Sequence, residues 1–246
     1  RVAEKTGVSA ELEAKELKGR IVVPYDWQES PIEVDLAYCY LNKLEMGGCE
    51  MDPRKMPALD INVDDFRFQK SHFGKVRLET TRVADGMRIE QLILTPRSTT
   101  MTARGGWYSR GQQQQSNLTM HLESSDIGRT LKALDYVGGI DDGEGVVDLE
   151  LAWPGSFAEV DASRIQGKLN MSLKDGYVLD VDPGAGRMFG MLSIQALPRR
   201  LLLDFSDVFK TGFGFDRMKG NFSIEDGDAY TNNLYMEGPA ARIDIA

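Results

Sequence analysis

The regular alternation of apolar and polar residues is the feature that most constrains the fold of this chain. Over residues 32–38 and 59–64, for example, every second residue is apolar and the residues between them are mainly acidic. Successive side chains of a β-strand point to opposite faces, so such a run predicts a strand with one apolar and one solvated face. Similar runs recur from residue 76 to residue 238, and strands that follow one another in this way are typical of an antiparallel meander.

Turn signals separate most of these runs. Asp-Gly pairs at 175–176 and 226–227 predict two hairpin turns. The polar tract 109–116, which contains four glutamines, predicts a third turn. Within residues 8–23 the alternation changes parity near Lys15, which we interpret as one strand with a bulge. No long linker interrupts the pattern, so we expect a mainly β protein with one continuous sheet over residues 1–246.

Two segments interrupt the alternation and are predicted to be short helices, at about 125–137 and about 183–197. Ser124, Ser125 and Asp126 offer N-caps to the first helix, whose single apolar stripe suits a lid or end cap of the sheet. In the second helix Asp182 is a candidate N-cap and Pro198 a stop. Apolar residues cover more than half of its circumference, so we expect it to form only when it packs against an apolar surface.

Composition and charge exclude several classes of protein. Of the 246 residues 41% are hydrophobic and 27% are charged, which is ordinary for a folded chain and unlike a disordered one. A formal net charge of -9, with no basic cluster beyond Arg199 and Arg200, argues against nucleic acid as a partner. No apolar run is long enough to cross a bilayer as a helix. No signal peptide is recognisable, and because both ends look cut we expect a segment of a longer protein.

The two cysteines, Cys39 and Cys49, flank a glycine-containing loop. In an oxidising compartment they could close a small disulfide loop, and in a reducing compartment both would be free thiols. His72 and His121 are the two histidines, so the chain offers no histidine-rich set of metal ligands. We therefore expect no metal site.

The sequence offers no catalytic constellation. Asp141, Asp142 and Glu144 lie among glycines, but their spacing departs from that of an EF-hand loop, and a solvated turn is the favoured interpretation. The chain lacks a glycine-rich phosphate loop and the nucleophile elbow of a serine hydrolase. Most acidic residues alternate with apolar ones, as expected for the solvated face of a sheet. We predict a protein that is not an enzyme and needs no cofactor.

The chain resembles the YhdP branch of the AsmA-like proteins in three stretches. These are PALDINVDDFRF at 57–68, LAWPG at 151–155 and, most specifically, GRMFGMLSIQALPRRLLLDFSDVFKTGFGFDRMKGNFSIEDGDAYTNNLYMEGPAARIDI at 186–245. The resemblance implies a piece of a long periplasmic protein of Gram-negative bacteria, anchored in the inner membrane by a helix outside this chain. Such proteins are similar to bridge-like lipid transfer proteins, in which a long, curved antiparallel sheet forms an open apolar groove. That groove carries phospholipid towards the outer membrane, which with its proteins is a further candidate partner.

On this interpretation the apolar parity of the strands lines the groove and binds phospholipid acyl chains. The candidates for the groove lining are Leu118, Met120, Leu149, Leu151, Leu169, Met171, Leu203, Phe205, Phe222 and Leu234. On the second helix, which would cap or occupy the groove, the gate candidates are Met188, Phe189, Leu192 and Ile194. Each of these side chains would equally suit an ordinary core, and the helix would then plug one end of the sheet.

Three other interpretations stay open at this point. The first is a closed structural β-domain of an envelope protein with no lipid cargo, because alternation does not distinguish a filled core from a lipid-lined one. The second is an outer-membrane barrel, which needs strands of about 9–11 residues with aromatic girdles, whereas many runs here are shorter. The third is a carbohydrate-active enzyme, because the distance between two carboxylates depends on the fold.

Overall fold

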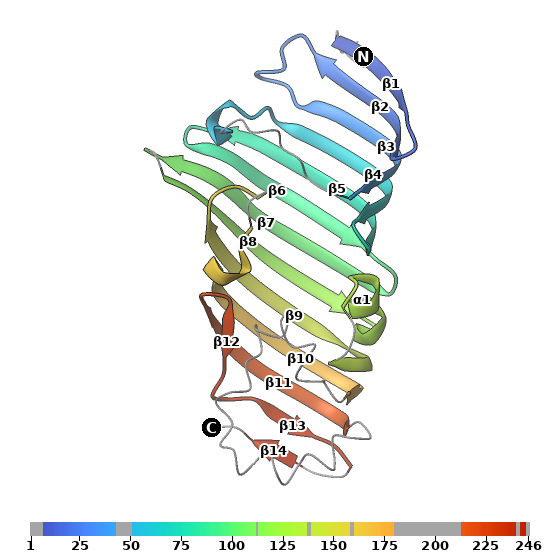
Figure 1. The fold of residues 1–246 in the computed structure, drawn as a ribbon, viewed down its shortest axis with the longest axis vertical. Coiled ribbons are helices and arrows are strands. Elements are labelled where there is room, and N and C mark those ends of the chain that lie inside the picture. Colours follow the sequence, from blue (N-terminus) through green and yellow to red (C-terminus); the bar gives the residue numbers. More distant parts are fainter. Residues whose placement is uncertain are drawn as a thin grey trace, which may run out of the picture. The chain divides into compact units, whose positions relative to one another are not determined.

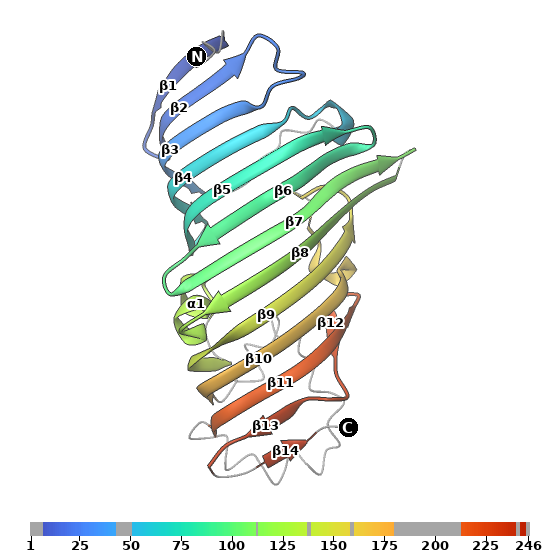
Figure 2. The ribbon, with the colours of Figure 1, turned by 180° about the vertical axis from the view of Figure 1, so that it is seen from behind.

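The computed structural model describes residues 7–42, 51–111, 113–136, 139–157, 160–179, 213–239 and 242–244. Most of these residues lie in strands of one open sheet, which confirms the mainly β prediction (Figures 1 and 2). The strands are β1 (Gly7–Glu13), β2 (Leu17–Pro24), β3 (Ile32–Leu41), β4 (Leu59–Phe68), β5 (Ser71–Val83), β6 (Gly86–Thr95), β7 (Thr99–Arg110), β8 (Gln113–Ser124), β9 (Ile140–Pro154), β10 (Gln166–Val178), β11 (Phe213–Glu225), β12 (Asp228–Tyr230), β13 (Tyr235–Glu237) and β14 (Arg242–Asp244).

Hydrogen bonds connect these strands in nearly their sequence order. The path runs from β1 to β11 and then through β13 to β14, while β12 pairs with β11 off the path. Within the described residues the path begins at β1 and ends at β14, so the sheet is open. Three short helices accompany it, η1 (Pro53–Lys55), α1 (Ile127–Ala133) and η2 (Ala162–Arg164). The chain divides into two compact units, which are described separately below.

Unit 1 comprises residues 1–96, 100–118 and 154–159. Its first two strands form a hairpin, with Glu13 opposite Lys18 and a turn in which the Ala14 amide donates to the Leu17 carbonyl. The single bulged strand predicted for residues 8–23 is therefore wrong. The change of parity near Lys15 reflects the reversal of the chain, because a tight turn shifts the alternation as a bulge does.

One strand pair in unit 1 departs from the antiparallel pattern. β3 and β4 run parallel, with Val34 opposite Ile61 and Leu36 opposite Val63. A parallel pair needs a connection that returns the chain to the same end of the sheet, and residues 42–58 supply one. The remaining strand pairs with a described register are antiparallel, so the prediction of a meander holds except at this crossover.

Unit 2 comprises residues 97–99, 119–153 and 160–246. The predicted turn at 226–227 is confirmed, because Asp226 and Gly227 have φ of 52° and 83° and connect β11 to β12. The predicted turn at 175–176 is wrong, since Asp175 and Gly176 lie inside β10. Asp175 has φ of 52°, yet the pairing of β10 with both neighbouring strands continues beyond it in unbroken register.

The first predicted helix is present but shorter than residues 125–137. Asp126 is its N-cap, and the carboxylate accepts a hydrogen bond from the Arg129 amide at 2.8 Å. The helix ends at Ala133 because Asp135 has φ of 60°, in the left-handed region that a right-handed helix does not continue through. The second predicted helix, at 183–197, lies outside the described residues. No helix among the described residues is long and apolar enough to cross a membrane.

Candidate functional site

Strands β9, β10 and β11 place apolar side chains in register on one face of unit 2. Leu149, Leu169 and Phe222 lie opposite one another across the three strands. The neighbouring rows are Leu151–Gly167–Ile224, Val147–Met171–Gly220 and Gly145–Leu173–Met218. We call this set of rows the unit 2 apolar face. The rows arise because each strand alternates with a period of two and the registers place the same parity on the same side.

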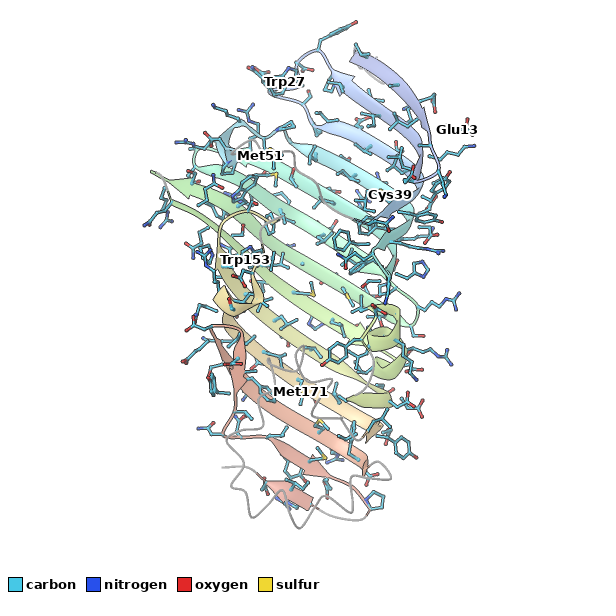
Figure 3. The ribbon with its side chains drawn as sticks, in the orientation of Figure 1. Glu13, Trp27, Cys39, Met51, Trp153 and Met171 are labelled. Carbon is cyan, nitrogen blue, oxygen red and sulfur yellow. The ribbon has the colours of Figure 1, made fainter. Side chains whose placement is uncertain are left out.

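Burial divides this face into two parts. Leu149, Leu169 and Met171 are only half-buried, and Met171 is labelled in Figure 3. Leu173 and Met218, in contrast, are 2% and 3% exposed. Paired sheets in a filled sandwich bury the side chains of both inner faces. The half-buried side chains of β9 and β10 therefore offer apolar surface to a ligand, whereas the row of Leu173 belongs to a packed core.

The opposite face of the same strands is polar. Its rows include Asp148–Asn170–Asn221 and Glu144–Lys174–Arg217, and all six side chains are exposed. In the second row Glu144 lies opposite Lys174, so a carboxylate faces a cation, whereas Lys174 and Arg217 are two cations side by side. This face is suited to water.

Unit 1 carries a second apolar face, and its rows are not among the groove-lining residues predicted from the sequence. Its two clearest rows are Ile21–Val34–Ile61–Leu78–Leu92–Ala103 and Leu36–Val63–Val76–Leu94–Met101. Several of these side chains, including Val34, Ile61 and Leu78, are half-buried. The same alternation that singled out unit 2 is present here, so the pattern could have identified these rows. The polar parity of these strands, with Asp35, Asn62 and Arg77, is exposed.

A bulge in β3 changes which of its side chains lie on the apolar face. Between Leu36 and Cys39 the register with β2 shifts, so Cys39 continues the apolar parity and pairs with Leu17 and Phe66. Tyr38 instead lies opposite Lys18, on the polar parity, where its hydroxyl donates to the carbonyl of Ala14 at 2.9 Å. The alternation in residues 32–38 did not reveal this because a bulge depends on the neighbouring strand.

The thiol of Cys39 is buried, and this burial raises its pKa (Figure 3). A raised pKa lowers the fraction of thiolate and hence the reactivity of the side chain. Cys49 lies outside the described residues, so the disulfide between the two cysteines stays a prediction.

Segment 51–56 is hydrogen-bonded to the start of β8 in unit 1. Trp107 of β7 is 2% exposed, and its indole N–H donates to the side-chain oxygen of Gln114 at 2.9 Å. The amide nitrogen of Gln114 in turn donates to the Met51 carbonyl at 2.9 Å. These bonds satisfy the polar atoms that the burial of Trp107 would otherwise leave unpaired. The glutamine tract thus forms the start of β8 as well as a turn.

The structure distributes the predicted lining residues unevenly. Leu118 and Met120 are half-buried on β8, and Leu151 is half-buried on β9. Leu234 packs against the core of unit 2, and Phe222 is only 5% exposed. The candidates that lie outside the described residues are Met188, Phe189, Leu192, Ile194, Leu203 and Phe205. That the ten candidates line a groove, and that Met188, Phe189, Leu192 and Ile194 form a gate, stay predictions.

The acidic residues near the start of β9 are Asp141, Asp142 and Glu144, and Asp141 is paired with Lys132. Asp141 accepts a hydrogen bond from Lys132 at 2.6 Å, and this bond lowers the pKa of the carboxyl group. Asp142 has φ of 52° and is exposed, as is Glu144. Among the described residues no group of three or more histidine, cysteine, aspartate or glutamate side chains could hold a metal ion.

His121 of β8 is the centre of a charged cluster. Its Nδ1 lies 2.6 Å from a carboxylate oxygen of Asp148, and its Nε2 lies 3.2 Å from Glu123. The hydrogen bond with Asp148, followed by that with Glu123, raises the pKa of His121 above its ordinary value. The cluster therefore favours the protonated imidazole.

This shift predicts a pH-dependent contribution to stability. A pKa raised on folding adds stability that is full below the unfolded pKa of about 6.5 and is lost as pH rises through the folded pKa. We expect His121→Gln to lower the free energy of unfolding by less than about 1 kcal/mol at about pH 5.5, because the pair is exposed, and to change it little near pH 9. Urea unfolding of both chains at the two pH values measures the difference. A larger loss at the higher pH would contradict the assignment.

Comparison with known proteins agrees with the resemblance of the three stretches. A model of the family described as YhdP protein matches residues 2–246. The intermembrane phospholipid transporter YhdP of Escherichia coli (strain K12) is 25% identical over 191 residues, which are 77% of this chain. The matched region is 15% of the length of that transporter. No solved structure matches the chain.

Proposed function

We propose that this chain, which belongs to the YhdP family, binds phospholipid acyl chains on its apolar sheet faces and takes part in moving phospholipid between membranes. The observation that supports this most directly is the row Leu149–Leu169–Phe222 with its neighbours. It is an ordered apolar surface on an open sheet, and the side chains of β9 and β10 in it are half-buried. The relative in Escherichia coli is named a phospholipid transporter, and acyl chains are the ligand that such a surface suits.

The energetics favour this use of the face. Exposing the acyl chains of a diacyl lipid, with about thirty methylenes, to water costs about 20 kcal/mol of free energy at about 0.8 kcal/mol per CH2. Covering half of the acyl-chain surface with protein therefore removes a large part of the free-energy barrier to transfer. The four rows from Gly167 to Leu173 span about 20 Å along the strands at about 3.4 Å per residue. The polar parity keeps the outside solvated, and the head group can stay in water at the open edge of the sheet. No bond is made or broken in such a transfer, so the proposed role is not enzymatic.

The location follows from the same proposal. An intermembrane route in a Gram-negative envelope crosses the periplasm, and we place this chain there. An inner-membrane anchor would belong to a part of the protein outside this chain, and the outer membrane or its proteins would receive the lipid. In this view residues 1–246 form one segment of a longer apolar groove, with the helix at 183–197 as its gate.

Adjacent residues on opposite faces provide the test. A photo-crosslinking amino acid is introduced at Leu169 or at Asn170 in the full-length protein in cells, and covalent lipid adducts are measured by mass spectrometry. We expect phospholipid adducts from position 169 and none above background from position 170, because consecutive strand residues point to opposite faces. Equal adducts at both positions, or none at position 169, would refute the proposal.

A closed structural domain without cargo is the alternative. The described strands form a path with two ends, whereas closure would require the first and last strands to pair. In a closed domain the crosslinker at position 169 would capture protein and no lipid, so the same experiment distinguishes the two functions.

A further inference from the structure

Helix α1 packs onto one end of the unit 2 apolar face. Ile127 is 6% exposed and belongs to one buried cluster with Leu173, Phe215, Met218 and Met236. Leu131, on the next turn of α1, also packs against this cluster. A helix of seven residues is too short to be stable by itself in water, so its packing on the sheet is what maintains it.

The backbone of α1 lies very close to β9. A Cβ atom added at Gly128 would lie 2.6 Å from the Asp142 amide nitrogen and 2.9 Å from the Asp141 Cα, so only glycine fits there. Lys132 reaches across the same contact and donates to Asp141 at 2.6 Å. An acyl chain has no room between α1 and the sheet at this point, because the two backbones are already in contact.

A buried group of hydroxyls fixes the other side of α1. Thr99, Ser124 and Thr130 are all buried, and their hydroxyl oxygens are mutual hydrogen-bond partners. Thr130 also donates to the carbonyl of Asp126 at 3.0 Å, and the Asp126 amide donates to Ser124 at 3.0 Å. The first turn of the helix is thereby bonded to the ends of β7 and β8. These contacts make α1 a fixed cover.

We infer that α1 sets the boundary of the lipid-binding surface in unit 2. Acyl chains have access to the row of Leu149, and they are excluded from the row of Leu173 and from Ile140 and Val178 beyond it. The row of Met171 lies at the boundary, because Val147 and Met171 also pack against the α1 cluster. Ile140 and Val178 pair with each other and both pack against the α1 cluster. The inference rests on the proposed function and goes further, because it assigns the extent of the site and the element that limits it.

Two positions on one strand test the boundary. A photo-crosslinking amino acid is placed on β9 in the full-length protein in cells, either at Leu149, in a row of the apolar face, or at Ile140, which packs against the α1 cluster. We expect the phospholipid adduct at position 140 to be at least about tenfold weaker than at position 149, because Ile140 packs against the α1 cluster and Leu149 does not, although both are half-buried. Comparable adducts at both positions would overturn the boundary and leave the proposed function intact. No adduct at either position would overturn both.

A change in α1 itself tests whether the helix is the cause. Gly128→Ala raises the intrinsic helix propensity of α1 but adds a methyl group where β9 allows none, so it displaces the helix from the sheet. In this variant the adduct at position 140 is expected to rise towards that at position 149. Arg129→Ala is the matched control, since Arg129 is exposed and its loss leaves the contact with β9 in place. An adduct at position 140 that stays low in Gly128→Ala, with the adduct at 149 retained, would show that α1 does not set the limit.

Discussion

Replacement of Phe215 by alanine is expected to lower the free energy of unfolding of unit 2 by about 3–5 kcal/mol. Phe215 is 2% exposed and lies in the buried cluster beneath α1. Its ring also covers Gly176 on the neighbouring strand, where an added Cβ would lie 2.6 Å from the ring. The change thus removes a large apolar side chain, leaves a cavity and exposes a glycine backbone. Urea unfolding followed by circular dichroism measures the loss.

Tyr177 provides the control for this prediction. It is an aromatic residue of β10, next to Gly176, but its side chain is 52% exposed. Tyr177→Ala is expected to change the free energy of unfolding by no more than about 0.5 kcal/mol, because surface substitutions away from special features have small effects. If the two variants unfolded at the same urea concentration, the core of unit 2 would not be where the structure places it.

Replacement of Leu169 by aspartate is expected to abolish lipid capture on the unit 2 apolar face. Leu169 lies between Leu149 and Phe222 in the central row, and a carboxylate there would lose its hydration when an acyl chain binds. A cost of about 1.4 kcal/mol lowers binding tenfold, and the desolvation of a charge exceeds that. We expect the lipid adduct from a photo-crosslinker at position 149 to fall by at least about tenfold. The full-length protein is used, and circular dichroism of the purified variant shows whether it folds.

Ser172→Asp is the matched control for this charge. Ser172 lies on the polar face, opposite Lys219, so the new carboxylate faces a cation and water. Lipid capture at position 149 is expected to equal that of the unchanged protein. If Leu169→Asp folded and still captured lipid at the unchanged level, the apolar rows would not be the binding surface. If Leu169→Asp and Ser172→Asp lost lipid capture equally, the loss would reflect the added net charge and not the apolar face on which Leu169 lies.

Local patterns predicted part of this structure well. The Asp226–Gly227 turn and the Asp126 cap each depend on residues close in sequence, and both are present. The Asp175–Gly176 pair has the same residues as a true turn but lies within β10, since pairing on both sides continues past it. The length of α1 was overestimated because the left-handed Asp135 is not visible in an apolar stripe.

The order of residues along each strand specifies which side chains share a face, because the two-residue period is a relation between close neighbours in the chain. That period is enough to predict a mainly β chain with one apolar and one polar face. Which strands are neighbours, and in which direction β3 and β4 run, is set by the packing of the folded chain. That packing also decides that α1 covers the row of Leu173 and not the row of Leu169. Those choices depend on contacts between residues far apart in the chain, and a local period contains no information about them.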